Sequence, residues 1–268
     1  MKIIGEKING TRKQVGAAIA SRDADFIRSL ACKQAEAGAA WLDVNAGTTP
    51  DREPDDLLWL VRLVQEAVDL PLSLDSANPK ALSAAIGEVK RTPLINSISG
   101  EPDRLSGVLP IAAEQGCEVI ALAMDDKGIP ADVASRMAVV RNLIAATRAA
   151  GLPDAKVYVD PLVMTIATNT ECGHIALDTI RAVHATYPQV HISTGLSNVS
   201  FGLPKRALIN RTFLTLAMAA GMDTAIADPL DRELKAALLA TDLLLGRDKH
   251  CLGYTRAYRA GLLENAKA

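Results

Sequence analysis

The sequence has little that points to a metal centre or to redox chemistry. Its four cysteines lie far apart without a Cys-x-x-Cys pair, and its four histidines show no spacing typical of metal ligands. We therefore expect no metal bound by this chain. Cys32 and Cys117 stand in apolar surroundings, where a free cysteine usually packs as a small hydrophobic residue.

An excess of one charge and long apolar runs are absent as well. The net charge is −2 and the basic residues are scattered along the 268 residues, which is not the pattern of a protein that binds nucleic acid or an anionic membrane. No apolar run approaches the roughly 18 residues of a membrane span, and the first ten residues turn polar too early for a signal peptide. We expect a cytoplasmic protein.

Aliphatic residues dominate the chain, which is 49 % hydrophobic and only 3 % aromatic. Strand-like runs alternate with helical stretches eight times. The strand-like runs cover residues 1–5, 40–47, 70–76, 92–100, 117–125, 156–162, 190–198 and 222–230. The helical stretches cover residues 12–37, 54–68, 79–89, 102–115, 131–150, 173–185, 205–220 and 231–245. Eight such units favour an α/β fold, a single-domain (β/α)8 TIM barrel over residues 1–268, rather than an open doubly wound sheet. Residues 248–268 follow the eighth unit and should form a tail or a terminal helix.

Carboxylate and carboxamide side chains stand at the ends of nearly all predicted strands. They are Glu6, Asn9, Asp43, Asn45, Asp75, Asn96, Asp125, Asp160, Asn198 and Asp228. Any one of them could simply cap the helix that follows. Because the strand ends of a barrel meet at the face where catalytic groups gather, the set as a whole is better explained as the lining of a site.

A lining rich in acids and amides, without a cluster of cations, is a poor phosphate site. A carboxylate can accept two parallel N–H bonds from an amino-pyrimidinone edge, and an asparagine can pair with a lactam. The residue types therefore favour a neutral heterocycle such as a guanine-like or pterin-like ring.

The connection GLSNVSFGLPKR, residues 195–206, is unusual between a strand and a helix. Asn198 can donate to or accept from a ligand nitrogen. Phe201 can cover a bound ring or plug the top of the barrel. Lys205 and Arg206 can bind an anionic ligand tail, or be solvated cations of the first helical turn.

Eight segments at the predicted strand ends closely resemble the pterin-binding methyltransferases. They are IIGEKINGT, LDVNAG, LSLDS, LINSIS, DPLV, GLSNVSFG, INRTF and AGMDTAIADPLD, in this order. Members of this family transfer a methyl group between methyltetrahydrofolate and the cobalt of a corrinoid protein, as in acetogens and in the folate-dependent part of cobalamin methionine synthase. The residues FGLPKR depart from the acetogen pattern and look more similar to methyltransferases of O-demethylase or betaine-demethylation systems. The direction of transfer stays open.

The resemblance implies roles for particular residues. Asp75, Asn96 and Asp160 would hold the pterin edge, and Asn198 would act as the catalytic group beside the methyl-bearing nitrogen. Further pterin contacts would come from Asn9, Asp43, Gly195, Ser197, Arg206 and Ile226.

The resemblance also implies partners. The Asp-x-His-x-x-Gly signature of cobalamin domains is absent, so a separate protein would carry the corrinoid, and the barrel mouth would stay open to admit it. The chain would form a homodimer. Two alternatives remain: a dihydropteroate synthase, which would need more cations for its pyrophosphate leaving group, and a folate-binding protein without catalysis. A Schiff-base aldolase is disfavoured because no lysine stands at a late strand end.

Overall fold

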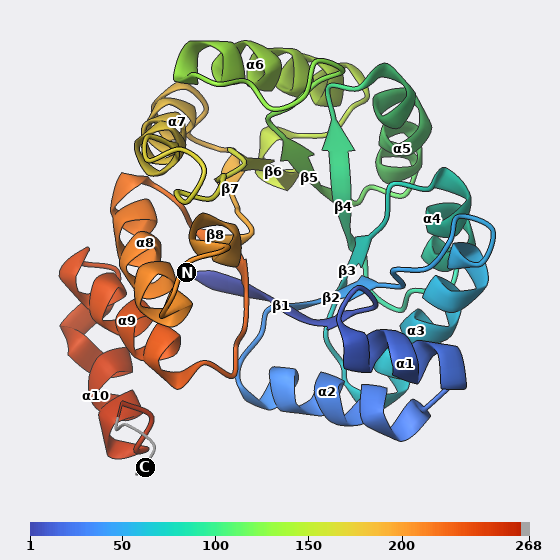
Figure 1. Cartoon of the computed structure of the whole chain (residues 1–268), viewed down its shortest axis with the longest axis horizontal. Helices are drawn as coiled ribbons and strands as arrows, with labels where there is room; N and C mark the ends of the chain where they lie inside the picture. The colour runs from blue at the N-terminus through green and yellow to red at the C-terminus, as the bar shows by residue number, and fades with distance from the viewer. Residues whose placement is uncertain (264–268) are drawn as a thin grey trace.

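A ring of parallel strands forms the centre of the molecule, and helices cover its outside (Figure 1). The computed structural model describes residues 1–263. The strands are β1 (Lys2–Asn9), β2 (Trp41–Asn45), β3 (Leu72–Asp75), β4 (Leu94–Ser99), β5 (Glu118–Leu122), β6 (Val157–Asp160), β7 (His191–Ile192) and β8 (Thr224–Ala227). They pair in the order β7-β6-β5-β4-β3-β2-β1-β8. The predicted α/β class and (β/α)8 barrel are confirmed.

The helices alternate with the strands along the chain. They are α1 (Lys13–Ser21), α2 (Ala24–Glu36), α3 (Glu53–Ala67), α4 (Pro79–Ile86), α5 (Pro102–Glu114), α6 (Val133–Ala149), α7 (Cys172–Thr186), α8 (Arg206–Ala220), α9 (Arg232–Leu244) and α10 (Leu252–Arg259). Three short 3₁₀ turns are η1 (Asp154–Lys156), η2 (Leu196–Ser200) and η3 (Lys249–Cys251). The predicted tail thus contains helix α10, which packs beside α9. Residues 264–268 of that tail lie outside the described part of the chain.

Alternation along each strand separates two cores. On β2, Leu42 and Val44 belong to the main apolar core between strands and helices, whereas Trp41 packs with residues such as Ile4 and Tyr158 in a smaller cluster. Because successive side chains of a strand point to opposite faces, the smaller cluster fills the inside of the barrel. The polar residues Asp43 and Asn45 follow Trp41 on the same inner face.

The barrel closes between β7 and β8 without a regular ladder. Asp223 N donates to Ile192 O at 3.3 Å, and Ile226 N donates to Thr194 O at 3.0 Å. Near the opposite end from the mouth, His191 Nδ1 lies 2.6 Å from Asp223 Oδ2. These contacts join the last strands, so β7 and β8 complete the wall.

Two predicted elements are wrong in their extent. The helix expected over 12–37 is broken at Arg22, which adopts a left-handed φ of 56°, and Asp23 caps the new helix by accepting from Phe26 N at 3.1 Å. The strand expected over 190–198 ends at Ile192 and turns into η2. Leu196 and Val199, three residues apart, are both 2 % exposed, and this spacing places both on one side of a 3₁₀ turn, where the core holds them.

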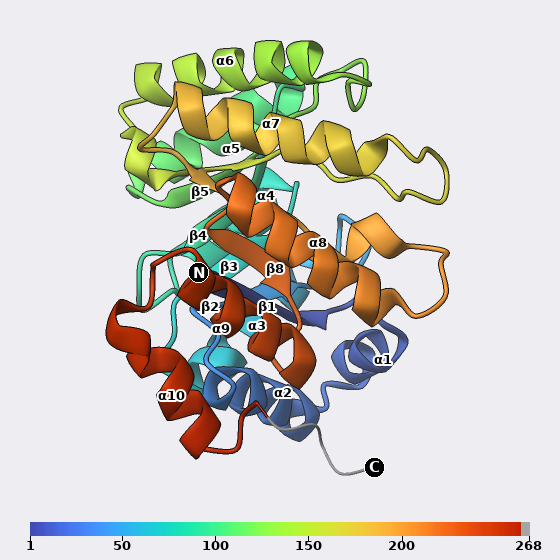
Figure 2. The same cartoon turned by 90° about the vertical axis from the view of Figure 1, so that its left-hand side faces the viewer.

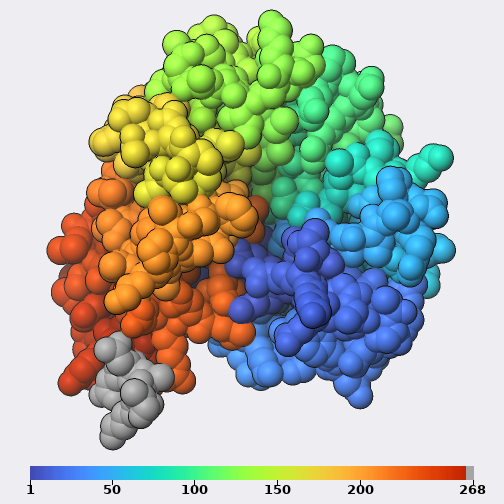
Figure 3. Space-filling view, in the orientation of Figure 1, coloured from blue at the N-terminus to red at the C-terminus, as the bar shows by residue number. Residues whose placement is uncertain are grey.

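The carboxyl ends of the strands open at one end of the barrel, which we call the mouth. The loop after β6 and the η2 turn project on the same side as α1 (Figure 2). Viewed onto this end, the surface is hollowed between the residues around η2, in orange, and the N-terminal residues, in blue (Figure 3). Within residues 1–263, no helix has both the length and the apolar character needed to span a membrane.

Candidate active site at the barrel mouth

Two carboxyl groups on neighbouring strands share one side of the mouth. Asp43 on β2 is 3 % exposed and makes a side-chain hydrogen bond with Asp75 on β3. Burial raises the pKa of Asp43 well above its usual range, and the charge of Asp75 adds to this effect. The raised pKa favours the protonated form of Asp43, which can donate to Asp75, because two adjacent buried carboxyl groups cannot both ionise readily.

The other polar atoms around this pair fix its orientation. Asp43 Oδ1 accepts from Ser73 Oγ at 2.7 Å and from Asn96 Nδ2 at 3.2 Å. Asp75 Oδ2 accepts from Asn45 Nδ2 at 2.8 Å. Since the amide nitrogen of Asn96 is bound to Asp43, its carbonyl oxygen is left as an acceptor.

Asp75 lies beside Asn96 in the parallel pairing of β3 and β4. Burial raises the pKa of Asp75, while the Asn45 amide and the positive charge of Arg104 on α5 act in the opposite sense. Arg104 is itself held by Ser97, through Nε to the carbonyl oxygen at 3.2 Å and Nη2 to Oγ at 3.1 Å. This cation thus favours the ionised form of Asp75.

Asp160 at the end of β6 stands on another part of the same ring of strand ends. It is 5 % exposed, and its Oδ1 accepts from Leu162 N at 2.7 Å. Burial raises the pKa of Asp160 to about 6, although the Leu162 amide favours the carboxylate. At neutral pH Asp160 is therefore an acceptor, as the side-chain oxygen of Asn96 is.

The η2 turn presents Asn198 to solvent at the mouth. Asn198 is exposed, and within residues 1–263 its side-chain amide has no hydrogen-bond partner. A Cβ atom on Gly195 would lie 3.0 Å from Asn198 Nδ2, so glycine at position 195 leaves the room that this amide occupies. The arrangement leaves the amide available to a ligand.

Arg206 holds the backbone of the η2 turn in place. Arg206 Nη2 donates to Ser197 O at 2.7 Å and Nε donates to Ser200 Oγ at 3.1 Å. Its guanidinium lies 5.7 Å from the centre of the Phe201 ring, which is 66 % exposed. Arg206 therefore supports the turn, and its predicted contact with a ligand stays a prediction.

Part of the polar ring has a local role that the sequence reasoning underrated. Asn9 Oδ1 accepts from Thr11 N at 3.0 Å, Asp125 Oδ1 from Lys127 N at 2.9 Å, and Asp228 Oδ1 from Leu230 N at 3.0 Å. A side chain that accepts from the amide two residues later forms an Asx turn. These three groups shape the loops that leave the strands, and Asp160 forms the same kind of turn with Leu162 N, so a turn contact does not by itself exclude a ligand contact.

The β1–β8 side of the mouth carries two ion pairs. Arg12 Nη2 lies 2.7 Å from Glu6 Oε1, and Lys7 Nζ lies 2.5 Å from Asp228 Oδ2. Burial raises the pKa of Glu6, and Arg12 opposes the shift. Next to this group, Ile226 packs its side chain against the cluster inside the barrel and bridges to Gly195, so it stands where it can form an apolar floor.

Sequence reasoning missed the residues that orient the acceptors. Ser73 and Arg136 act through contacts with residues 30 and 25 positions away in the chain, and Arg104 contacts Ser97 seven positions before it. An alternating strand pattern indicates that Ser73 faces inward with Asp75, and this signal was available. The two arginines lie on helices, where nothing in the local pattern separates them from ordinary surface cations.

A family model described as "Pterin binding enzyme" matches residues 5–228. Methylcorrinoid:tetrahydrofolate methyltransferase of Eubacterium limosum is 40 % identical over 270 residues, which cover 100 % of this chain and 100 % of that protein. Methionine synthase of Mycobacterium leprae is 30 % identical over 84 % of this chain and 20 % of its own length.

Solved structures of dihydropteroate synthase have the same fold. The Yersinia pestis protein with a pterine-sulfa conjugate gives a TM-score of 0.66 at 18 % identity, covering 91 % of this chain and 94 % of that one. The Vibrio fischeri protein gives 0.67 at 18 % identity, covering 92 % and 93 %. With the family model and the full-length relative in agreement, the resemblance carried by the strand-end segments is confirmed, and the chain belongs to the family of pterin-binding enzymes.

Proposed function

We propose that the protein transfers a methyl group between methyltetrahydrofolate and the cobalt of a corrinoid protein, in a direction that the site geometry leaves open. The observation that carries the proposal is the set of acceptors at the mouth: Asp75, Asn96 and Asp160, with the unpaired amide of Asn198 on the η2 turn. The full-length relative named methylcorrinoid:tetrahydrofolate methyltransferase supports the same activity.

The acceptors match the hydrogen-bonding edge of a reduced pterin. That edge presents an amino group and ring N–H groups, which are donors. Ionised carboxylates and an amide oxygen accept from such groups, and hydrogen bonds to a charged acceptor are the stronger kind. Asp43, Asn45 and Ser73 contribute by holding the acceptors in place, so Asp43 acts beneath the ligand.

Asn198 supplies what the departing amine needs. When a methyl group is transferred from a tertiary amine, the amine is a poor leaving group unless its nitrogen is protonated or strongly hydrogen-bonded in the transition state. The amide of Asn198 can donate to the nitrogen lone pair or accept from its proton. An interaction that strengthens as the methyl group leaves lowers the activation free energy of methyl transfer. Equal binding of the substrate and the transition state does not.

The proposed activity has a direct assay. Methyltetrahydrofolate and reduced free cobalamin are mixed with the protein, and the colour change on cobalt methylation is followed. Turnover is expected. Condensation of a pterin pyrophosphate with p-aminobenzoate would instead identify a dihydropteroate synthase, and pterin binding without either reaction would identify a non-catalytic folate-binding protein.

The proposed partner is a separate corrinoid protein that docks at the mouth, and the expectation that this chain binds no metal stays a prediction. Groups of three or more His, Cys, Asp or Glu placed to hold a metal are absent from residues 1–263. The proposal also includes a cytoplasmic location.

Exposed apolar side chains lie along one half of the rim of the mouth, on the loops that follow β5 to β8. They are Ile129, Met164, Phe201 and Leu230.

Asp160→Asn should weaken folate binding by roughly 5- to 15-fold at pH 8, because a charge-assisted bond of about 1.5–3 kcal/mol is replaced by a neutral one of about 0.5–1.5 kcal/mol. Since the pKa of Asp160 is about 6, wild-type affinity should fall as pH drops through 6, and the variant should show a shallower fall in which Asp75 still titrates. Calorimetric titration between pH 5 and 8 measures both effects. Unchanged affinity at pH 8 would contradict the assignment.

Asn198→Ala should lower the single-turnover rate of methyl transfer by roughly 10- to 100-fold with saturating folate, because a transition-state hydrogen bond of about 1.5–3 kcal/mol is lost. Folate affinity should suffer less than in the Asp160 variant. Asn142→Ala, an exposed asparagine on α6, serves as the matched control. A normally melting Asn198→Ala protein with a rate within about twofold of wild type would end the catalytic role.

Phe201→Ser should slow methyl transfer with the corrinoid protein by about tenfold, because interface aromatics contribute strongly to association. Transfer to free cobalamin should be unchanged. Tyr258→Ser on α10 is a matched control, since Tyr258 is 62 % exposed and Phe201 is 66 % exposed. Equal losses with both acceptors would show that Phe201 covers the pterin instead.

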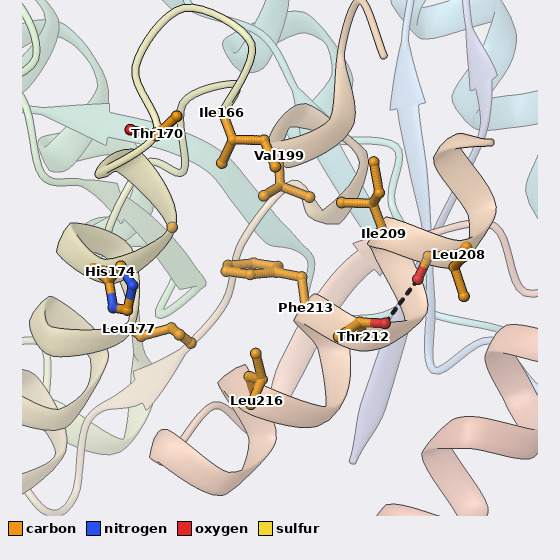
Figure 4. A pocket seen from close by; sticks show the side chains of 11 residues that line it. Ile166, Thr170, His174, Leu177, Val199, Leu208, Ile209, Thr212, Phe213 and Leu216 are labelled. Atoms are coloured by element: carbon orange, nitrogen blue, oxygen red, sulfur yellow. Dashed lines mark hydrogen bonds between the residues drawn. The ribbon is translucent and has the colours of Figure 1, made fainter. Parts of the chain in front are cut away.

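We also propose a homodimer, and α7 and α8 offer its surface. Between them lies an apolar cavity of about 330 Å³ lined by residues such as His174, Leu177 and Phe213 (Figure 4). Leu208 and Leu216 stand at its edge on α8, and they are 55 % and 47 % exposed. A twofold dimer brings the same surface patch of both copies together, so a second copy of this chain is the occupant that we propose for this apolar surface.

Leu208→Asp combined with Leu216→Asp should convert the dimer to a monomer at micromolar concentration, because each change places a charge in the apolar contact. Sedimentation velocity measures the state. The control is Leu244→Asp, which alters a leucine that is 83 % exposed on α9. A wild-type protein that sediments as a monomer, or a variant that still dimerises, would contradict this surface.

A further inference from the structure

Arg136 on α6 is a buried cation next to the mouth. Only 2 % of the residue is exposed. Its guanidinium donates to three backbone carbonyl oxygens, with Nε 2.9 Å from Pro130 O, and Nη1 2.6 Å from Pro161 O and 2.9 Å from Leu162 O. These contacts tie α6 and the loop before it to the loop that follows β6.

Two of the three carbonyls that Arg136 holds belong to Pro161 and Leu162, the residues directly after Asp160. Leu162 has a φ of 60°, in the left-handed region that is unfavourable for a residue with a large side chain. In this conformation Leu162 N donates to Asp160 Oδ1 at 2.7 Å. Arg136 thus fixes the backbone that supplies a hydrogen bond to the acceptor.

The charge of Arg136 has no direct ion-pair partner within residues 1–263. The titratable groups that face it are Asp160 from β6, Cys172 from α7 and Asp132 at the start of its own helix. A buried arginine without a paired carboxylate is costly. Three contacts with neutral carbonyl groups account for the position of Arg136. Its charge also acts on the nearby carboxyl group of Asp160.

Asp160 experiences that charge. Burial raises the pKa of Asp160, and the Leu162 amide opposes this effect most strongly; the charge of Arg136 acts in the same opposing sense and is the smallest of these contributions. On the β7 side, Thr194 and the Gly195 amide also face the carboxyl group. Arg136 is the cation among these neighbours, so its removal should change how readily Asp160 ionises.

We propose that Arg136 is a positioning residue for Asp160: it holds the Pro161–Leu162 segment in the conformation that directs the Leu162 amide at the carboxylate, and it places a positive charge beside that carboxylate. Arg136 does not touch the ligand. The inference about ionisation concerns the free protein, and only its effect on folate rests on the proposed function.

The test follows Asp160 itself in ligand-free protein. Carbon-13 NMR of labelled aspartate carboxyl groups gives the titration midpoint of Asp160, with Asp160→Asn to assign the signal. Arg136→Met should raise the midpoint by about one pH unit, the lower end of the effect of a nearby charge. Arg136→Gln is the second neutral variant if the Met variant does not fold. Arg136→Lys keeps the charge and should raise the midpoint by less than half as much.

Arg148→Met is the matched control, because Arg148 lies on the same helix but is exposed and pairs with Asp154 at 2.7 Å. It should leave the midpoint unchanged. A merely structural role of Arg136 would lower the melting temperature without moving the midpoint. A folded neutral variant with the wild-type midpoint, or an equal shift in Arg148→Met, would overturn the proposal.

A folate titration then separates this inference from the proposed function. In Arg136→Met, the pH at which affinity is half lost should rise with the NMR midpoint, and Asp160→Asn in the same background should remove that shift. If the midpoint moves but folate affinity does not follow it, Arg136 still positions Asp160, and the pterin assignment of Asp160 is the part that fails.

Discussion

The hydrogen-bonding pattern at the mouth of the barrel depends on how the protein accommodates carboxyl groups that are buried away from water. Asp43 and Asp75 cannot both ionise readily at close range, and burial raises the pKa of Asp43 well above its usual range, which favours a proton on Asp43. If Asp43 donates to Asp75 and accepts from Asn96, the donor or acceptor role of each group in the network is determined. The atoms left facing the mouth are acceptors, and this determines the kind of ligand that fits.

A second constraint is the rigidity of the loops that carry the site. Thr165 Oγ1 donates to Phe201 O at 2.6 Å, and Ile166 N donates to Val199 O at 3.1 Å, so the loop after β6 braces the η2 turn. Arg136 anchors the other end of the same loop beside Asp160. The acceptor on β6 and the amide on the turn are therefore held by one connected segment, and a bulky partner can approach without the site having to reorganise.

Much of this arrangement could be predicted from the sequence, because it depends on local patterns. Alternating strands and their polar end residues placed Asp160 and its fellow acceptors at the mouth. The end of β7 could not be predicted, because the buried pair Leu196 and Val199 selects a 3₁₀ turn through packing with the rest of the barrel. Arg136 could not be predicted either, since its partners are backbone carbonyls that leave no mark on residue type. The predicted ligand contact of Asn9 stays a prediction, because an Asx turn and a ligand contact use the same side chain.

The central claim is that the acceptors at the mouth hold the donor edge of a reduced pterin. Calorimetric titration of the protein with tetrahydropterin, and with an analogue in which a methyl group replaces the 2-amino group, tests it most directly. Loss of a donor to a buried charged acceptor leaves that acceptor unpaired, so the analogue should bind roughly 10- to 100-fold more weakly. Equal affinity for the two compounds would contradict the account.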